Sequence, residues 1–570
     1  MKKKIGLCAF VLFFSLTSCG VLNNSSDPSQ SVSDASSSAE SSSEPPVDDM
    51  SGITFESDMF VYDGQPHSIY ISGTLPAWVS VSYIGNGQTG LGTYRIGAQF
   101  TVLDESHTQP EEMIAILMIY NPASAVTVTE NGILYLFDSG SHTFSATGFD
   151  YDIPSVATIS SVVYGYDVTS IGYHAFGNCN VVTSFIIPDT VTTIGELAFH
   201  ECEILESVMI PHSVTSIGDG AFIYCYVLKE INVAAANQFY QSIDGNLYSK
   251  DGKTLISYCI GLTNALFVVP NGVTTIADYA FFVCPALTLI TLPDSVTSIG
   301  KSAFSRCTSL TAMLIPSAVR SIGDSAFEEC SSLVSIVIPD GVTSIENDVF
   351  RECEALTSVT IPSSVTSIGN SAFASCINLS SVTIPSGVTS IGNNAFIWCI
   401  ALTSVTIPDS VQEIGTSAFN NCSGLTSVTI GNGVIIIGSF AFAACSGLTA
   451  ISIPDSVTYI YDKAFYNCSG LVSVTLGNSV THIGDIAFGL CEDLASINIP
   501  ESVTYIGSAA FAECVALSTI TIPMNVTYIG SDAFLYCTQL TIYVEAPSRP
   551  FEWNPYWNSS RRPVVWGYVA

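Results

Sequence analysis

The sequence predicts a mainly β-structured solenoid with short helical turns, built from 23-residue repeats and preceded by a small β-sandwich domain. Three observations support this expectation. Fifteen cysteines between Cys179 and Cys537 recur at intervals of 23 residues, apart from one longer interval. Short apolar strand patterns recur in phase with these cysteines. Residues 51–122 instead contain short alternating segments separated by turn signals.

The N-terminus has the pattern of a secretion signal. Lys2, Lys3 and Lys4 precede an apolar run over residues 5–16 that is too short to span a bilayer stably. The run ends in Leu-Thr-Ser-Cys, which resembles the bacterial lipobox. The resemblance implies a signal peptide over residues 1–18 and lipidation of Cys19. The alternative is an ordinary secretory signal with an incidental cysteine.

A linker and a small domain are expected next. Residues 19–50 are rich in serine and poor in apolar residues, which is typical of a flexible tether. In residues 51–122 we expect the strands of a β-sandwich at residues 59–62, 68–72, 79–83, 94–102 and 114–120. The stretch from Tyr62 to His67 (YDGQPH), with Gly-Thr-Leu-Pro after it, resembles immunoglobulin-like YDG modules of bacterial surface proteins. The resemblance implies a spacer or adhesive stalk.

Residues 123–150 are expected to cap the solenoid, which then occupies residues 151–542. In a typical unit, Leu402, Val405 and Ile407 follow the L-x-x-L-x-L spacing of a leucine-rich repeat. Pro408 ends the strand. Asp, Asn or Ser then stands after the glycine position, where we expect it to cap a short helical turn carrying Ala-Phe and Cys inward.

The landmarks of nearly every unit are Ile-Pro, Ile-Gly-x-x-Ala-Phe and x-x-Cys. They resemble the BspA-like class of bacterial leucine-rich repeats over about 390 residues. Departures are local, such as Gly431 in place of proline and Tyr461 in place of glycine. The long interval from Cys225 to Cys284 predicts a hairpin insertion near 240–260, around Asp-Gly. Residues 543–570 break the period and are expected to form a C-terminal cap.

Composition narrows the possible partners. The chain has 570 residues and a formal net charge of −34. No basic patch stands out, so nucleic acid is not an expected partner. No motif of a zinc site, phosphate-binding loop or hydrolase nucleophile occurs, and the prediction is a protein that is no enzyme and has no catalytic residues, metal or cofactor.

The repeating cysteines admit two interpretations. The chain has 18 cysteines and is expected to face an oxidising environment, which favours disulfides. An in-register column, however, points its side chains in parallel, and fifteen is an odd number. We therefore favour a buried column of free thiols acting as small hydrophobes.

One surface column departs from the repeat pattern. The residue before the inward isoleucine of the Ile-Gly step is Ser or Thr in most early units, and becomes Tyr459, His482, Tyr505 and Tyr528 in the last four full units. Tyr461 is expected beside them, with Tyr466 and Tyr536 also near. Aromatic rows bind sugars or protein side chains because they offer a large area at low entropic cost. The competing interpretation is that the stacked rings only stiffen this end.

The predicted function is recognition at the cell surface. The BspA-like resemblance implies adhesion to host proteins or other cells, so we expect an extracellular protein or glycan ligand. The membrane is expected to hold this lipoprotein through its N-terminal lipid alone. The alternative is a structural or display protein of the cell envelope without a specific ligand, which the near-identical solvent positions of residues 355–430 favour.

Overall fold

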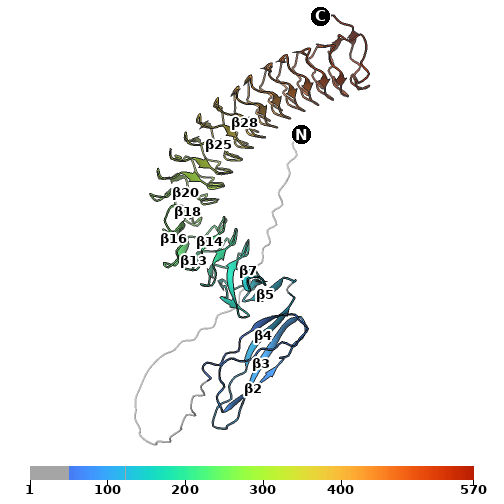
Figure 1. Cartoon of the computed structure of the whole chain (residues 1–570). Helices are drawn as coiled ribbons and strands as arrows, with labels where there is room; N and C mark the ends of the chain where they lie inside the picture. Colours follow the sequence, from blue (N-terminus) through green and yellow to red (C-terminus); the bar gives the residue numbers. More distant parts are fainter. Residues whose placement is uncertain (1–49, 122, 570) are drawn as a thin grey trace, which may run out of the picture.

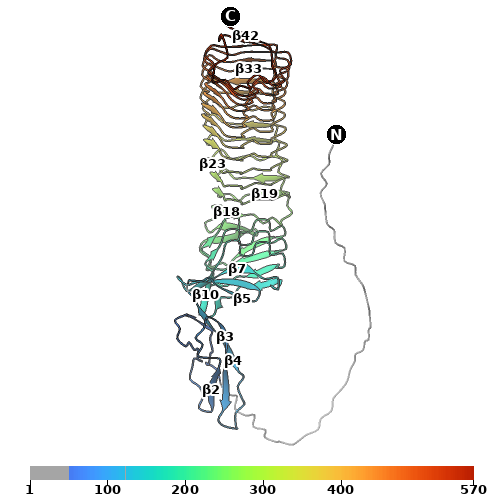
Figure 2. The ribbon, with the colours of Figure 1, turned by 90° about the vertical axis from the view of Figure 1, so that its right-hand side faces the viewer.

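The computed structural model describes residues 50–121 and 123–569. The expected signal peptide, Cys19 and nearly all of the linker lie outside the described residues. Within them every regular element is a β-strand and no helix is present. Figure 1 shows a curved stack of short coils with a small sheet domain at its N-terminal end, and Figure 2 shows the same stack turned by 90°. The predicted solenoid of 23-residue repeats with a β-sheet domain before it is therefore confirmed, whereas the expected short helical turns are absent from the described residues and the expected β-sandwich is a single sheet.

The small domain contains one four-stranded sheet in the order β1-β4-β3-β2. Its strands are β1 (Asp58–Val61), β2 (Val79–Ile84), β3 (Gly92–Val102) and β4 (Met113–Tyr120). Residues expected as a strand at 68–72 contribute only an isolated bridge, between Ser72 and Thr54. The sheet core is formed mainly by β2, β3 and β4, and Phe55 and Ile69 belong to it.

This domain packs directly on the start of the solenoid. The next strands, β5 (Val126–Glu130), β6 (Ile133–Asp138) and β7 (Thr143–Phe149), form an antiparallel meander. Met59, Met118 and Tyr120 share a buried cluster with this meander. The rings of Tyr120 and Phe137 meet edge to face at 5.4 Å. The meander therefore joins the two parts through a common core.

Two parallel ladders run along the solenoid. We call ladder A the series of strands that end in, or contain, the inward residue of the Ile-Gly step. The short β9 (Val162–Val163) pairs with its first strand, β10. Ladder A comprises β10 (Tyr166–Ile171), β12 (Thr193–Ile194), β14 (Ser216–Ile217), β18 (Thr254–Ser257), β20 (Thr275–Ile276), β22 (Ser298–Ile299), β23 (Ser321–Ile322), β25 (Ser344–Ile345), β27 (Ser367–Ile368), β28 (Ser390–Ile391), β30 (Glu413–Ile414), β32 (Ile436–Ile437), β34 (Tyr459–Ile460), β36 (His482–Ile483), β38 (Tyr505–Ile506) and β40 (Tyr528–Ile529).

Ladder B is the series of strands from the L-x-x-L-x-L part of each unit. In these strands a central buried residue alternates with outward neighbours, as in Ser358–Thr360. Ladder B comprises β8 (Val156–Thr158), β11 (Ser184–Ile186), β13 (Ser207–Ile210), β15 (Glu230–Val233), β19 (Leu266–Val268), β21 (Leu289–Thr291), β24 (Ser335–Val337), β26 (Ser358–Thr360), β29 (Ser404–Ile407), β31 (Ser427–Ile430), β33 (Ala450–Ser452), β35 (Ser473–Thr475), β37 (Ser496–Asn498), β39 (Thr519–Ile522), β41 (Thr541–Val544) and β42 (Val564–Trp566).

Phenylalanine and cysteine columns fill the interior between the ladders. Phe419 stacks on Phe396 at 5.2 Å and on Phe442 at 5.3 Å, with the ring planes within 4° of parallel. The thiol of Cys422 donates to the carbonyl of Phe396, 3.1 Å away, and most thiols repeat this contact one unit on. The sixteen cysteines from Cys179 to Cys537 are all buried free thiols. Burial raises the pKa of Cys399 to about 12.

The connection expected as a short helical turn has a different backbone. Asn394 and Trp398 both adopt the left-handed conformation, at φ 58° and 63°, and interrupt any helix. The amides of Asn394, Phe396 and Trp398 donate to carbonyls of the next unit, whereas those between them close tight turns. A helix directs all its amides along its own axis. Alternate amides here must instead satisfy the neighbouring coil, so tight turns replace the helix.

The expected helix-capping residues have a corresponding role between units. Asp462 Oδ1 accepts the amide of Asp485 at 2.8 Å, and Asp485 Oδ1 accepts the amide of Ser508 at 2.7 Å. Asn370 and Asn393 make the same contact. The expectation that these residues cap their own turn was wrong, because each accepts an amide 23 residues further along the chain, in the next coil.

The solenoid is interrupted between β15 and β19. There β16 (Tyr240–Ile243), β17 (Asn246–Ser249) and β18 form an antiparallel meander, and β18 pairs in parallel with β20. Tyr258 stacks on Phe281 at 5.3 Å and so substitutes for a column phenylalanine. Both ladders restart here, and the buried apolar residues divide into two clusters that meet at this point.

The C-terminal segment closes the last coil. Strand β42 pairs in parallel with β41. Trp557 lies edge-on against Phe534, the last ring of the phenylalanine column, at 6.0 Å. The indole of Trp553 is buried and donates to the carbonyl of Val526 at 3.0 Å. Tryptophan side chains thus cover the apolar end of the stack.

Candidate ligand-binding surface

Ladder A positions the predicted aromatic residues. In β34, β36, β38 and β40 the second residue is a buried isoleucine, so the first residue points outward. Parallel pairing aligns Tyr459 with His482, His482 with Tyr505 and Tyr505 with Tyr528. The structure therefore brings all four side chains into one row, which we call the aromatic column together with Tyr461.

The rings of the column stack along the solenoid. His482 lies 4.1 Å from Tyr505 with planes at 6°, and Tyr505 lies 4.8 Å from Tyr528 at 10°. Tyr459 is tilted by 41° to His482 at 5.6 Å. Tyr461 stacks on Tyr459 at 6.1 Å. Each such pair contributes about 0.5–1.5 kcal/mol beyond area burial.

Stacking determines which part of each ring a ligand can reach. The imidazole and the Tyr505 phenol each have a ring on both faces. The faces that a sugar would stack on are therefore covered at the centre of the column, and ring edges and phenol hydroxyls remain. Tyr459 is 43% exposed and Tyr461 is 41% exposed, whereas the other members are half-buried. The N-terminal end of the column is its most accessible part.

Carboxylates flank the column. Burial lowers the pKa of His482, although nearby Asp462 and Asp485 raise it. The imidazole is therefore neutral at neutral pH. Burial also raises the pKa of Tyr505, and Asp485 adds to that shift. The column thus offers neutral hydrogen-bonding edges beside two acidic side chains.

Two tyrosines that were expected near the column lie elsewhere in the unit. Among the ring contacts of residues 50–121 and 123–569, the column includes Tyr461 but neither Tyr466 nor Tyr536. Both follow the buried phenylalanine of the unit and so belong to the turn, away from ladder A. Position within the repeat, and not proximity in sequence, decides which rings meet.

A second ring series on the turns was missed by sequence reasoning. His174 and His200 lie 5.3 Å apart, His200 and Tyr224 also 5.3 Å, and Tyr224 and Phe282 5.2 Å. Arg306 donates to the Tyr224 hydroxyl at 2.6 Å. This series bridges the hairpin insertion, where the 23-residue register is lost. Only the three-dimensional course of the insertion brings Tyr224 to Phe282.

The His-Glu-Cys triplet at residues 200–202 has no catalytic arrangement. The Cys202 thiol donates to the carbonyl of Phe176 at 3.1 Å, and it is buried. Its pKa is raised by the neighbouring Cys225 and by burial. His200 lies 3.6 Å from the Glu201 carboxylate and not beside the thiol as a base. A protonated, buried thiol is not a nucleophile.

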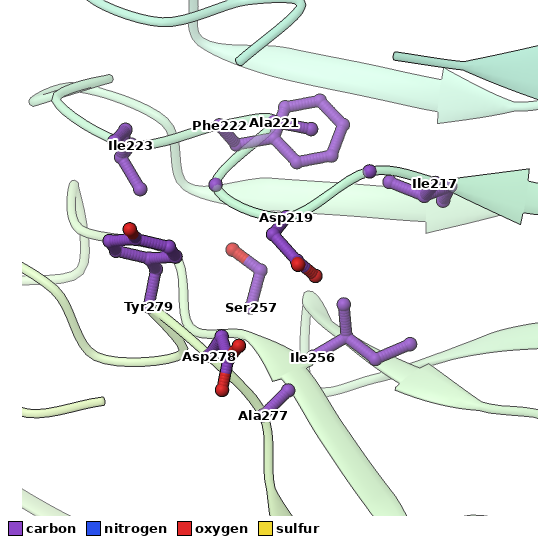
Figure 3. A pocket seen from close by; sticks show the side chains of 12 residues that line it. Ile217, Asp219, Ala221, Phe222, Ile223, Ile256, Ser257, Ala277, Asp278 and Tyr279 are labelled. Carbon is purple, nitrogen blue, oxygen red and sulfur yellow. The ribbon is translucent and has the colours of Figure 1, made fainter. Parts of the chain in front are cut away.

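A small cavity lies at the hairpin insertion (Figure 3). Asp219 and Ser257 point into it, and Asp278 lines it while its Oδ1 accepts the amide of Lys301 in the next coil. Burial raises the pKa of Asp219, and Asp278 and Glu196 raise it further. The volume of about 30 Å³ has room for little more than a water molecule. In the described ranges no group of three or more His, Cys, Asp or Glu is arranged to hold a metal ion.

The repeats match the model of a known protein family. The model of the family described as "BspA type Leucine rich repeat region (6 copies)" matches residues 155–253, 252–380, 343–471 and 413–541. Together these matches cover more than half of the chain. The chain belongs to the BspA-type leucine-rich-repeat family. The repeats that carry the aromatic column are therefore BspA-type repeats.

Solved bacterial leucine-rich-repeat structures are similar to this BspA-type chain. A protein from Bacteroides ovatus is 30% identical, with 77% of this chain and 99% of that chain covered and a TM-score of 0.47. A leucine-rich cell surface protein from Faecalibacterium prausnitzii is 29% identical, covering 70% and 94%, with a TM-score of 0.38. A protein from Eubacterium ventriosum is 25% identical, covering 52% and 95%, with a TM-score of 0.41. A search of the curated proteins finds no match.

In the part of the chain that the structure describes, no helix has the length and apolar character needed to cross a bilayer.

Proposed function

We propose that this chain is a lipid-anchored cell-surface protein that binds an extracellular protein or glycan through its solenoid. The BspA-type repeats support a surface binding role. The lipobox-like sequence before Cys19 supports anchoring by lipid alone, and the serine-rich linker supports display at a distance. The small sheet domain, with its YDG motif, serves as an immunoglobulin-like spacer between linker and solenoid.

The observation that carries the proposal is the aromatic column. In a solenoid whose outward ladder A positions are mostly serine or threonine, four successive coils expose rings there. Rings are large contact surfaces that lose little entropy on binding. Since the inner ring faces are covered, the ligand contacts ring edges, hydroxyls and the Asp462 and Asp485 carboxylates. A partner with hydrogen-bonding groups or positive charge fits this surface.

The experiment is a matrix-protein and glycan array probed with the full chain. The variant Tyr505→Ser with Tyr528→Ser removes the centre of the column, and serine is the residue that ladder A itself uses at Ser390. We expect at least a roughly tenfold loss of affinity for the ligand found, which is about 1.4 kcal/mol. Tyr536→Ser is the matched control, because Tyr536 is 59% exposed and lies outside the column.

The array also tests the alternative of a structural or display protein without a specific ligand. The regular outward serines and threonines of β26, β29 and β31 favour this alternative, since specific sites need variation. If binding is detected and the double variant keeps it unchanged, the column is not the binding site. If the full chain binds nothing on the array, the alternative is preferred.

A further inference from the structure

The outward positions of ladder B change chemistry in the coils that follow the hairpin insertion. From β26 onward these positions are mostly serine and threonine, as in Ser404 and Thr406. In the coils from β19 to β24 they are largely aliphatic. The residues concerned are Leu266, Val268, Leu289, Leu314 and Val337, which we call the apolar patch.

The members of the apolar patch are exposed and adjacent. Their exposed fractions are 61%, 68%, 42%, 78% and 57% in sequence order. Leu266 pairs with Leu289, and the bridges continue through Ala312 to the coil of Val337. Paired strands lie about 4.8 Å apart, so these side chains lie close together, with Thr291 and Ser335 as the polar residues among them. Contiguous exposed aliphatic groups are unfavourable in water and mark interaction sites.

A groove with acidic margins borders the patch. Its volume is about 400 Å³, and Leu314 and Val337 line it together with Pro316 and Pro339. Asp294 and Asp340 also line it. Neither carboxylate has a hydrogen bond or ion pair with another residue in the described ranges. Their charges are therefore available to a partner.

The equivalent aspartates of later coils are not available in this way. Asp409 accepts the amide of Asn432 at 2.6 Å, and Asp455 accepts the amide of Asn478 at 2.7 Å. The nearby cation, Arg320, donates to the carbonyls of Ser317 and Val319 and forms no ion pair within the described part of the chain. Of these four aspartates, the two that lie beside the exposed aliphatic surface, Asp294 and Asp340, are thus the two that do not bond the next coil.

We propose that the apolar patch and its groove dock an extended protein segment whose aliphatic or aromatic side chains are flanked by lysine or arginine. The aliphatic side chains supply the hydrophobic contact, and Asp294 and Asp340 select the basic flanks. A second copy of the chain is disfavoured because each copy carries a net charge of −34. An anionic bilayer is disfavoured for the same reason. The patch is on ladder B and acts independently of the aromatic column.

The test uses the purified full chain and a phage-displayed library of random peptides. The variant Leu314→Thr with Val337→Thr introduces residues that the same positions carry in later coils, such as Thr360, so folding is preserved. Ile186→Thr with Met209→Thr is the matched control. Both residues are 52% exposed at equivalent ladder B positions before the insertion. A third variant, Asp294→Asn with Asp340→Asn, removes the charges and keeps the shape.

We expect the selected peptides to combine apolar residues with flanking Lys or Arg. A synthetic peptide from the selection should bind at least about tenfold more weakly to the Leu314 and Val337 variant. The asparagine variant should bind more weakly and with less salt dependence. The control and the Tyr505→Ser, Tyr528→Ser variant should bind as the unaltered chain does.

Several binding results would overturn the proposal. They are the absence of any enriched peptide, enrichment without basic residues, equal binding to the Leu314 and Val337 variant, and a dimer in sedimentation that this variant dissociates. Partition of the chain onto vesicles of phosphatidylcholine through the patch would overturn it as well, since the surface would then be a lipid contact.

Discussion

The imidazole of His482 lies flat against the phenol ring of Tyr505, with centroids 4.1 Å apart and planes inclined by 6°. The two residues are paired neighbours in ladder A, so the backbone register and not local sequence brings them together. Burial lowers the pKa of His482 despite Asp462 and Asp485. The neutral imidazole is therefore the form that this stack holds.

Acidification should weaken the C-terminal coils through His482. Because the pKa of His482 is lower in the folded chain, the unfolded chain binds the proton more tightly. The stabilisation is complete above about pH 6.5 and is lost as the pH falls through the folded-state pKa. The urea midpoint should fall between about pH 7.5 and pH 5, and this fall should be smaller for His482→Ser than for the unaltered chain. In free energy of unfolding, the losses of the two chains should differ by at most about 1 kcal/mol, because the His482 ring is half-exposed. Equal falls in both chains contradict this role.

Removing a single ring from the phenylalanine column should be strongly destabilising. Phe419 is fully buried between Phe396 and Phe442. Phe419→Ala should lower the free energy of unfolding by about 3–5 kcal/mol, because it leaves a cavity in a packed core. Urea denaturation followed by circular dichroism measures the loss. Phe551→Ala is the control, because Phe551 is 92% exposed and its removal should change the midpoint little. Similar urea midpoints for both variants would show that the phenylalanine column does not stabilise the core.

The cysteine column should resist thiol reagents in the folded chain. All sixteen cysteines from Cys179 to Cys537 are buried, and burial raises the pKa of Cys468 to about 12. The reactive thiolate is therefore scarce at neutral pH. An aromatic disulfide reagent should label none of them until denaturant is added. The added thiol of Ser427→Cys, at an exposed ladder B position, should react at once and serves as the control. Rapid labelling of any of these sixteen cysteines in the folded chain, located by peptide mapping, would contradict the buried column.

Anchoring should depend on Cys19. Cys19→Ala removes the expected site of acylation, so the chain should move from the membrane fraction to the supernatant of the producing bacterium. Immunoblotting of the two fractions measures this shift. Cys8→Ala lies in the same N-terminal segment and should leave the chain with the membrane. Membrane retention of the Cys19→Ala chain would show that something other than this lipid holds it.

The repeat period was enough to predict much of the architecture. Residues 23 apart occupy the same place in successive coils, so the sequence alone placed Tyr459, His482, Tyr505 and Tyr528 in one row. The same argument placed the phenylalanines and cysteines inside. These predictions hold because stacking converts sequence period directly into spatial proximity.

The turn backbone was not predictable in this way. The polar residue after the glycine suits a helix cap, but Asp462 and Asp485 bond the next coil instead. Local pattern cannot show whether an amide finds its partner in its own turn or in a neighbour. The neighbour prevails here because every coil offers the next a matching row of carbonyl groups.

The sequence by itself determined the repeat, its inward residues and the row in which the aromatic side chains stand. Tertiary structure alone decided which surfaces of those side chains remain reachable. Ring faces are covered because the coils stack at strand spacing. Tyr224 meets Phe282 because the chain leaves the 23-residue register at the hairpin insertion. Tertiary structure also decided that Asp294 and Asp340 stay unpaired, whereas Asp409 and Asp455 accept hydrogen bonds from the next coil. The physical reason is that packing between coils, which no single repeat encodes, sets exposure and hydrogen bonding.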